Sequence, residues 1–183
     1  MAFEQAAKFV VQELVIRANG AVTFPDNTIQ TTAYTGDLSP LARYGQVSKT
    51  TSGTITIATQ STYQSTGLTA TLDSVASGVA LGTTNTFAIK NTSGETRVFD
   101  IFASMDCDTS TTSSVVGIGL AKNGTLNTST ECRAWAVANQ SAKLVTSWMI
   151  ELAPNDEIAL FVANHSGTGT MNFLRGRIVA RTV

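Results

Sequence analysis

The chain contains a single histidine, which limits the enzyme chemistry that the sequence can support. His165 lies in the segment Asn-His-Ser-Gly, directly after a predicted strand. Any Ser–His–acid or Cys–His site would have to use this residue, and no Gly-x-Ser-x-Gly sequence surrounds a serine. We therefore interpret His165 as a turn residue at a strand end, and we expect no catalytic residue and no enzyme activity.

The sequence also lacks the residues that usually form metal and cofactor sites. One histidine cannot form a pair of ligands, and no glycine-rich loop joins a strand to a helix. Asp106 and Asp108 flank Cys107 and could bind calcium through oxygen atoms, but no third carboxylate follows at the spacing of a calcium loop. We favour a solvated Ser/Thr loop at this place, and we predict no metal and no cofactor.

The two cysteines, Cys107 and Cys132, are far apart in the sequence and do not form a zinc-binding pattern. A disulfide between them stays open as an alternative. Two reduced, buried thiols are the favoured interpretation, because a free cysteine behaves as a small hydrophobic residue.

Three arginines near the C-terminus share one face of the last predicted strand. Arg175, Arg177 and Arg181 are spaced by multiples of two residues, the period of a strand. This face could dock onto an acidic partner or lie near the axis of a trimer. Alternatively, it is the solvated face of an edge strand, which its charge protects from unwanted pairing.

The composition excludes several classes of protein. Of the 183 residues only 14% are charged, against about a quarter in typical domains, and the net charge is −1. This balance argues against a nucleic-acid partner, which normally requires a basic surface. We expect no membrane segment, because no apolar stretch is long enough for a spanning helix, and the N-terminus does not have the pattern of a secretory signal.

Short strands are the elements that must position these residues. Alternating apolar residues bounded by Gly, Asn and Pro turns predict strands over 54–60, 86–91, 96–106, 114–122, 131–139, 143–152, 157–164 and 172–183. In 96–106 the alternation places Phe99, Ile101, Ala103 and Met105 on one face. This pattern predicts an all-β fold, an antiparallel β-sandwich.

The predicted strand over 157–164 is apolar on both faces. A neighbouring subunit could cover its outer face, or small alanines could face solvent on a central strand. Both interpretations stay open at this stage.

The chain divides into three zones: an N-terminal arm over 1–35, a linker over 36–53 and a β domain over 54–183. Residues 3–17 could form an amphipathic helix, but the later part of the arm favours β-hairpins after a short helix or a loose start. The arm is too short to bury a core by itself. We therefore expect it to pack on other copies or on another protein.

Within the arm, the segment 19–34 resembles a short sequence that recurs in fibre and virion structural proteins of tailed bacteriophages. In that sequence Phe-Pro-Asp-Gly-Thr precedes Gln-Thr-Thr-Ala, and here Asn27 replaces the usual glycine. Asn also adopts left-handed turn conformations. The matching residues are Gly20, Phe24, Pro25, Asp26, Thr28, Gln30, Thr31, Thr32 and Ala33.

The β domain resembles the jelly roll of the tumour necrosis factor family and of the complement globular head. The similar segments are 120–124, 151–164 and a final strand that ends at the chain terminus. This resemblance implies a jelly-roll β-sandwich that assembles as a homotrimer around a three-fold axis.

Together the two resemblances imply a homotrimeric decoration (cement or knob) protein on the surface of a phage capsid. Its partners would be its own copies and the major capsid protein. The alternative is a tail-fibre tip, or receptor-binding module, that contacts a host surface receptor through loops 106–114 and 165–171; an extracellular or spore-surface adhesion module is a third class. The residues expected to anchor the arm to the capsid are Phe3, Phe9, Val11, Leu14, Ile16, Val22, Phe24 and Ile29.

Overall fold

The computed structural model describes residues 43–74, 76–83, 87–109 and 112–183, together with three two-residue strands nearer the N-terminus. The chain forms two units, Met1–Leu41 and Ala42–Val183. The second unit thus begins earlier than the expected domain over 54–183. The reason is that Tyr44–Lys49, expected in the linker, forms strand β4, which pairs with the last strand of the chain and buries Val47 completely.

The first unit contains a small antiparallel sheet of strands β1 (Val15–Ile16), β2 (Val22–Thr23) and β3 (Ile29–Gln30). Ile16 pairs with Val22, and Thr23 pairs with Ile29. Both pairings join strands that follow one another along the chain, and the Phe-Pro-Asp-Asn sequence lies between β2 and β3. The remaining residues of the possible helix over 3–17 lie outside the described residues.

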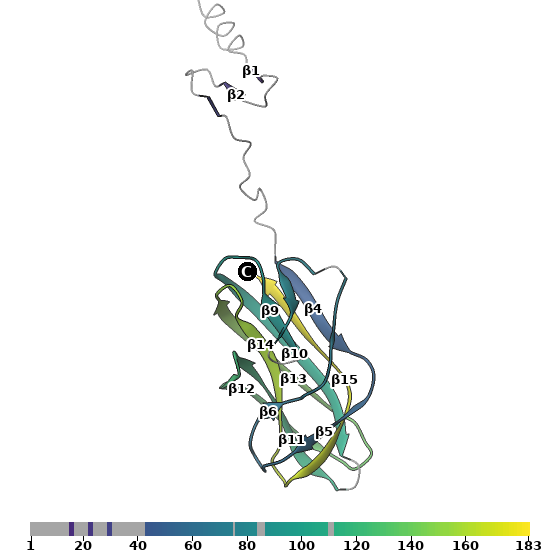
Figure 1. Cartoon of the computed structure of the whole chain (residues 1–183). Helices are drawn as coiled ribbons and strands as arrows, with labels where there is room; N and C mark the ends of the chain where they lie inside the picture. The colour runs from purple at the N-terminus through teal and green to yellow at the C-terminus, as the bar shows by residue number, and fades with distance from the viewer. Residues whose placement is uncertain are drawn as a thin grey trace, which may run out of the picture. The chain divides into compact units, whose positions relative to one another are not determined.

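The second unit is a sandwich of two sheets (Figure 1). In the first, which we call the β10 sheet, the strands follow the order β13-β10-β15-β4-β7, and β5 also pairs with β15. All its pairings are antiparallel. Besides β4, its strands are β5 (Gly53–Ile57), β7 (Thr71–Leu72), β10 (Arg97–Thr109), β13 (Ala142–Leu152) and β15 (Gly169–Thr182).

The second sheet, the β14 sheet, follows the order β12-β11-β14-β9-β8, and β6 also pairs with β14. Its strands are β6 (Gln64–Ser65), β8 (Val79–Leu81), β9 (Ala88–Asn91), β11 (Ser114–Lys122), β12 (Thr125–Ala136) and β14 (Glu157–Asn164). The predicted hairpin between β11 and β12 is confirmed. Asn123 and Gly124 have φ angles of 50° and 83°, which suit the two-residue turns that join antiparallel strands.

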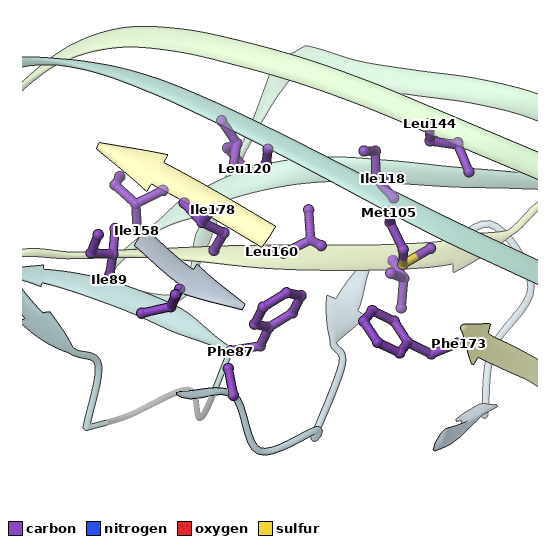
Figure 2. Packing of buried hydrophobic residues seen from close by; sticks show 14 of the residues in the cluster. Phe87, Ile89, Met105, Ile118, Leu120, Leu144, Ile158, Leu160, Phe173 and Ile178 are labelled. Carbon is purple, nitrogen blue, oxygen red and sulfur yellow. The ribbon is translucent and has the colours of Figure 1, made fainter. Parts of the chain in front are cut away.

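The core lies between the sheets and consists of aliphatic and aromatic side chains from both (Figure 2). Phe87 and Phe173 meet edge to face, with their ring centroids 5.7 Å apart. Phe99, Ile101 and Met105 of β10 are fully buried, as the alternation in the sequence predicts. Within the described residues, no helix has the length and apolar character needed to cross a membrane.

Strand β14 is buried on both faces, and the chain itself supplies the outer cover. Ala159 and Ala163 are almost completely buried, so they do not face solvent. Strand β6 pairs with β14, and Tyr63 ahead of β6 reaches to β11, where its hydroxyl packs against Gly117. Glu157 at the start of β14 accepts hydrogen bonds from the backbone N–H and hydroxyl of Thr83, at 2.7 and 2.6 Å. No neighbouring subunit is needed to explain this apolar strand.

Candidate interaction surface

The side chains that point away from the core on β4, β10, β13 and β15 form one continuous surface, which we call the outer β10 face. In its centre, Phe102 is flanked by Ser147 of β13 on one side and by Val179 of β15 on the other. The strand period extends this row along the sheet. The surface comprises Gln46, Ser48, Val98, Asp100, Phe102, Ser104, Asp106, Lys143, Val145, Ser147, Met149, Arg175, Arg177, Val179 and Arg181.

The β13 side of this face is apolar and exposed. Met149 is 64% exposed and Val145 49%, while Phe102 and Val98 on the neighbouring strand are also exposed. Strand β13 lies at the end of the described sheet, so no other described strand pairs with its outer edge. Contiguous exposed apolar side chains on a soluble protein often mark an interaction site.

Asp–Arg pairs cross the centre of the face between β10 and β15. Asp100 accepts a hydrogen bond of 2.8 Å from the guanidinium of Arg181, and Asp106 accepts one of 2.7 Å from Arg175. Both arginine side chains are about two-thirds exposed, so these pairs add little to stability. They instead orient the arginines along the strand.

Arg177 is held differently from its two neighbours. Its guanidinium lies over the ring of Phe102, 5.8 Å from the ring centroid, in a cation–π contact. The three arginines do share one exposed face, as predicted. However, β15 lies between β10 and β4, so the interpretation of this face as that of an edge strand is wrong.

Three hollows open on this side of the β10 sheet. The first, of 390 Å³, is lined by side chains of β4, β10, β13 and β15, including Lys49, Lys143 and Arg175. The second, of 630 Å³, extends over Phe102 and Val179 and shares Gln46 and Arg177 with the first. The third, of 430 Å³, lies near the start of β15. The outer β10 face is therefore hollowed as well as partly apolar.

His165 lies on the opposite sheet, away from these hollows. Its ring meets the edge of Tyr63, with centroids 5.6 Å apart, and its buried Nε2 atom has no hydrogen-bond partner among the described residues. Burial lowers the pKa of His165, and the nearby guanidinium of Arg133 lowers it further, against an opposing effect of Glu131. Burial likewise raises the pKa of Tyr63. His165 follows a strand end, as predicted, and its ring packs against Tyr63.

Asp106 and Asp108 lie in strand β10 rather than in the expected Ser/Thr loop. Their carboxylates point outward, where Asp106 binds Arg175 and Asp108 accepts a hydrogen bond of 2.7 Å from the amide of Asn172. The side chain between them, Cys107, points into the core. Among the described residues, no group of three or more His, Cys, Asp and Glu is placed to hold a metal ion.

Both cysteines are free, as the favoured interpretation predicted. Cys107 is fully buried, while Cys132 on β12 is half-buried. Burial, followed by the negative charges of Asp108 and Asp106, raises the pKa of Cys107 to about 12. This thiol therefore stays protonated and unreactive in the folded protein.

The expected anchor residues all belong to the first unit. Ile16, Val22 and Ile29 lie in its strands β1, β2 and β3. Phe3, Phe9, Val11, Leu14 and Phe24 lie outside the described residues. The exposed residues Val145 and Met149 were not singled out from the sequence; the only signal for them was their alternation with the inward-facing Leu144, Thr146, Trp148 and Ile150.

Comparison with known proteins identifies the fold. No family model matches the chain, and no curated protein sequence matches it. Among solved structures it is similar to the Eiger TNF of S. frugiperda, with a TM-score of 0.54 and 11% identity over 78% of this chain and 92% of that one. The second unit is thus an antiparallel sandwich of the tumour necrosis factor jelly-roll type, which confirms the predicted fold class.

Two further structures are similar with TM-scores below 0.5. The globular domain of zebrafish complement 1qA protein has a TM-score of 0.47 and 10% identity over 77% of this chain and 95% of that one. The vertex protein P5 of PRD1 has a TM-score of 0.43 and 13% identity over 76% and 96%. Because these scores are lower, the fold assignment rests on the insect protein.

Proposed function

We propose that this chain is a structural protein of a tailed-bacteriophage virion. In this proposal three copies associate through their jelly-roll domains, and the N-terminal segment binds the major capsid protein, so that the trimer decorates and stabilises the capsid surface. The observation that carries the proposal is the exposed apolar part of the outer β10 face. The resemblance of residues 19–34 to phage structural proteins supports the virion assignment.

The outer β10 face has the properties of a subunit contact. Phe102, Val145 and Met149 together expose apolar surface. Its burial in a contact would stabilise the association of two copies by roughly 25 cal/mol per Å². No other described strand pairs with the outer edge of β13, and natural sheets usually cover or protect such an edge. In a closed ring of three copies, the β13 side of each copy packs on the apolar part of the outer β10 face of the next, around Phe102 and Val179, and leaves the first hollow uncovered. The low charge of the whole chain fits this role, because interface cores are depleted of charge.

The first unit fits a capsid anchor. Its described strands have only two residues each, and a sheet of this size is not stable in water without further packing. A second protein surface would supply this packing. A stable attachment would require about 1,000 Å² or more of buried surface, which three such segments in one trimer could supply.

The anchoring role is tested with capsids from which this protein has been removed. We expect the full chain to sediment with these capsids, and a chain beginning at residue 36 to stay trimeric but remain in the supernatant. The shortened chain retains the whole second unit and its core. If it binds the capsids as tightly as the full chain, the N-terminal segment is not the anchor.

A second candidate function is that of a tail-fibre tip, or receptor-binding module. The observation that favours it is Trp135, which is 61% exposed on the outer side of β12. Trp135 pairs with Val115, and Val115 accepts a hydrogen bond from the backbone of His165, so an exposed aromatic ring lies beside residues 165–168, which join β14 to β15. The rest of the expected loop 165–171 belongs to β15. Exposed aromatic side chains are frequent anchors in binding sites. Binding of the second unit alone to host cells, lost in Trp135→Ala, would favour this function over decoration.

A further inference from the structure

We propose that the first hollow of the outer β10 face, the one of 390 Å³, binds a phosphate group. This inference goes beyond the proposed function, since a decoration protein needs no small ligand. It rests on the charges, hydroxyl groups and volume of the hollow. The lining residues that matter are Ser48, Lys49, Thr50, Ser104, Asp106, Lys143, Arg175 and Arg177.

The hollow concentrates positive charge in a protein that is nearly neutral overall. Four cationic residues line it, three of them on the outer β10 face, and Asp106 is its single carboxylate, whereas the whole chain has a net charge of −1. Clefts lined by one sign of charge focus the electrostatic potential and attract ligands of the opposite sign. The excess of three positive charges therefore favours an anion that carries more than one negative charge.

The cations retain free donors for a ligand. Asp106 is occupied by the Nε atom of Arg175, and the side chain of that arginine is still 67% exposed. Arg177 is positioned by the ring of Phe102 and makes no ion pair with a carboxylate of the described residues. Lys49 donates one hydrogen bond, to the hydroxyl of Thr51 at 3.0 Å. An ammonium group has three donors and a guanidinium five.

The remaining lining groups suit the oxygen atoms of a phosphate. The hydroxyls of Ser48, Thr50 and Ser104 can donate to oxygens that the cations do not reach. Charge-assisted hydrogen bonds from Arg and Lys to phosphate oxygens are short and strong. The volume lies within the range of small-molecule sites, so the hollow can also hold a group esterified to the phosphate.

Binding is measured by titration calorimetry of the full chain with inorganic phosphate, at constant ionic strength adjusted with chloride. We expect saturable binding, weakened about tenfold in Lys143→Gln and in Arg177→Gln, the loss that corresponds to one charge-assisted hydrogen bond. The matched control is Lys90→Gln, which removes a lysine of the β14 sheet far from the hollow and should leave the affinity unchanged. Circular dichroism verifies that each variant is folded.

Two results would overturn the assignment: no saturable binding of phosphate beyond the effect of chloride, or equal affinities in all three variants. A sugar phosphate that binds more tightly than inorganic phosphate would identify an esterified phosphate as the ligand, and weaker binding would identify the free ion; both outcomes support the site. Sedimentation of the same samples tests the trimer separately. If the protein is a monomer that binds phosphate, the phosphate site is supported and the proposed trimer is contradicted.

Discussion

At the scale of single residues, Asn91 shows how a polar side chain can hold a turn region together. Its amide nitrogen donates to the carbonyl of Leu152 at 2.9 Å, to that of Glu95 at 2.9 Å and to that of Ala153 at 3.2 Å. Its side-chain oxygen accepts from the backbone and the hydroxyl of Ser93. Asn91 is 99% buried, so its own amide group cannot exchange these partners for water.

Asn91→Ala is therefore expected to lower the free energy of unfolding by about 2–4 kcal/mol, because it leaves buried polar groups without partners. Urea denaturation provides the measurement. Ser93→Ala, which removes one hydroxyl from the same cluster, should cost only about 1 kcal/mol. Equal, small losses in both variants would show that the Asn91 network does not stabilise the fold.

His165 makes the stability dependent on pH. Its lowered pKa means that the folded protein keeps the ring neutral while the unfolded chain takes up a proton below a pH of about 6.5. The unfolded state then binds more protons, so stability falls as the pH drops from about 6.5 toward the folded-state pKa. The groups that face the ring are Tyr63, Arg133 and Glu131.

The contribution of His165 is isolated by comparing the wild type with His165→Gln, because carboxylates also titrate as the pH falls. The midpoint of unfolding is measured for both proteins at pH 8.0 and at pH 5.5. From the higher to the lower pH, it should decrease more in the wild type than in the variant. An identical decrease in both proteins would mean that the buried ring does not couple protonation to folding.

At the scale of elements, most strands of four or more residues could be predicted, whereas the shortest could not. The first half of β12 (Thr125–Ala136) was missed, because the prediction covered only 131–139. Strands β10, β11, β13, β14 and β15 lie close to their predicted ranges because alternation over many residues identifies a half-buried strand. Strands β6, β7 and β8 have two or three residues each, and their pairing depends on neighbours that are distant in the sequence. Strand β4 could not be predicted from the sequence either, because Val47 is the only one of its residues with a large core side chain.

The double burial of β14 shows a second limit of the sequence. Its apolar pattern indicated that something covers the outer face, but it did not reveal that the cover is Tyr63 and the segment before β6. Glycines make this packing possible: a Cβ atom at Gly117 would lie 2.5 Å from the hydroxyl oxygen of Tyr63 and 2.9 Å from Nε2 of His165. These distances are too short for normal contacts.

Gly117→Ala should therefore push Tyr63 and His165 off the β14 sheet and destabilise the protein by about 1–3 kcal/mol, the usual cost of overpacking. Thermal unfolding and the fluorescence of tyrosine would report the change. Gly167→Ala is the matched control, because a Cβ atom there meets open space, and it should have almost no effect. If both variants melt alike, Tyr63 does not pack on β11 as described.

At the scale of the whole molecule, the proposed trimer depends on the outer β10 face as a contact between copies. Alternation in the sequence correctly placed Leu144 and Leu152 of β13 toward the core, which leaves Val145 and Met149 outside. A single chain, however, contains no pattern that distinguishes a solvated apolar residue from one that a second copy covers. The exposed apolar surface around Val145 and Met149 was therefore found only in the structure, and the second copy that covers it belongs to the proposed function.

Met149→Glu is expected to convert the trimer to monomers, because it would bury a carboxylate without a partner in the contact. The fold should survive, since Met149 is 64% exposed in the single chain. Sedimentation velocity provides the measurement. Trp135→Glu, at an equally exposed apolar position of the other sheet, should leave the trimer intact; monomers in that variant alone would place the contact on the β14 sheet.

The most direct test of the central claim is the copy number of this chain in purified virions, measured by quantitative mass spectrometry against the major capsid protein. A decoration trimer predicts a ratio near one or one-third. A ratio of a few per cent would contradict decoration and indicate a protein of the tail. Absence of the chain from virions would contradict both virion functions.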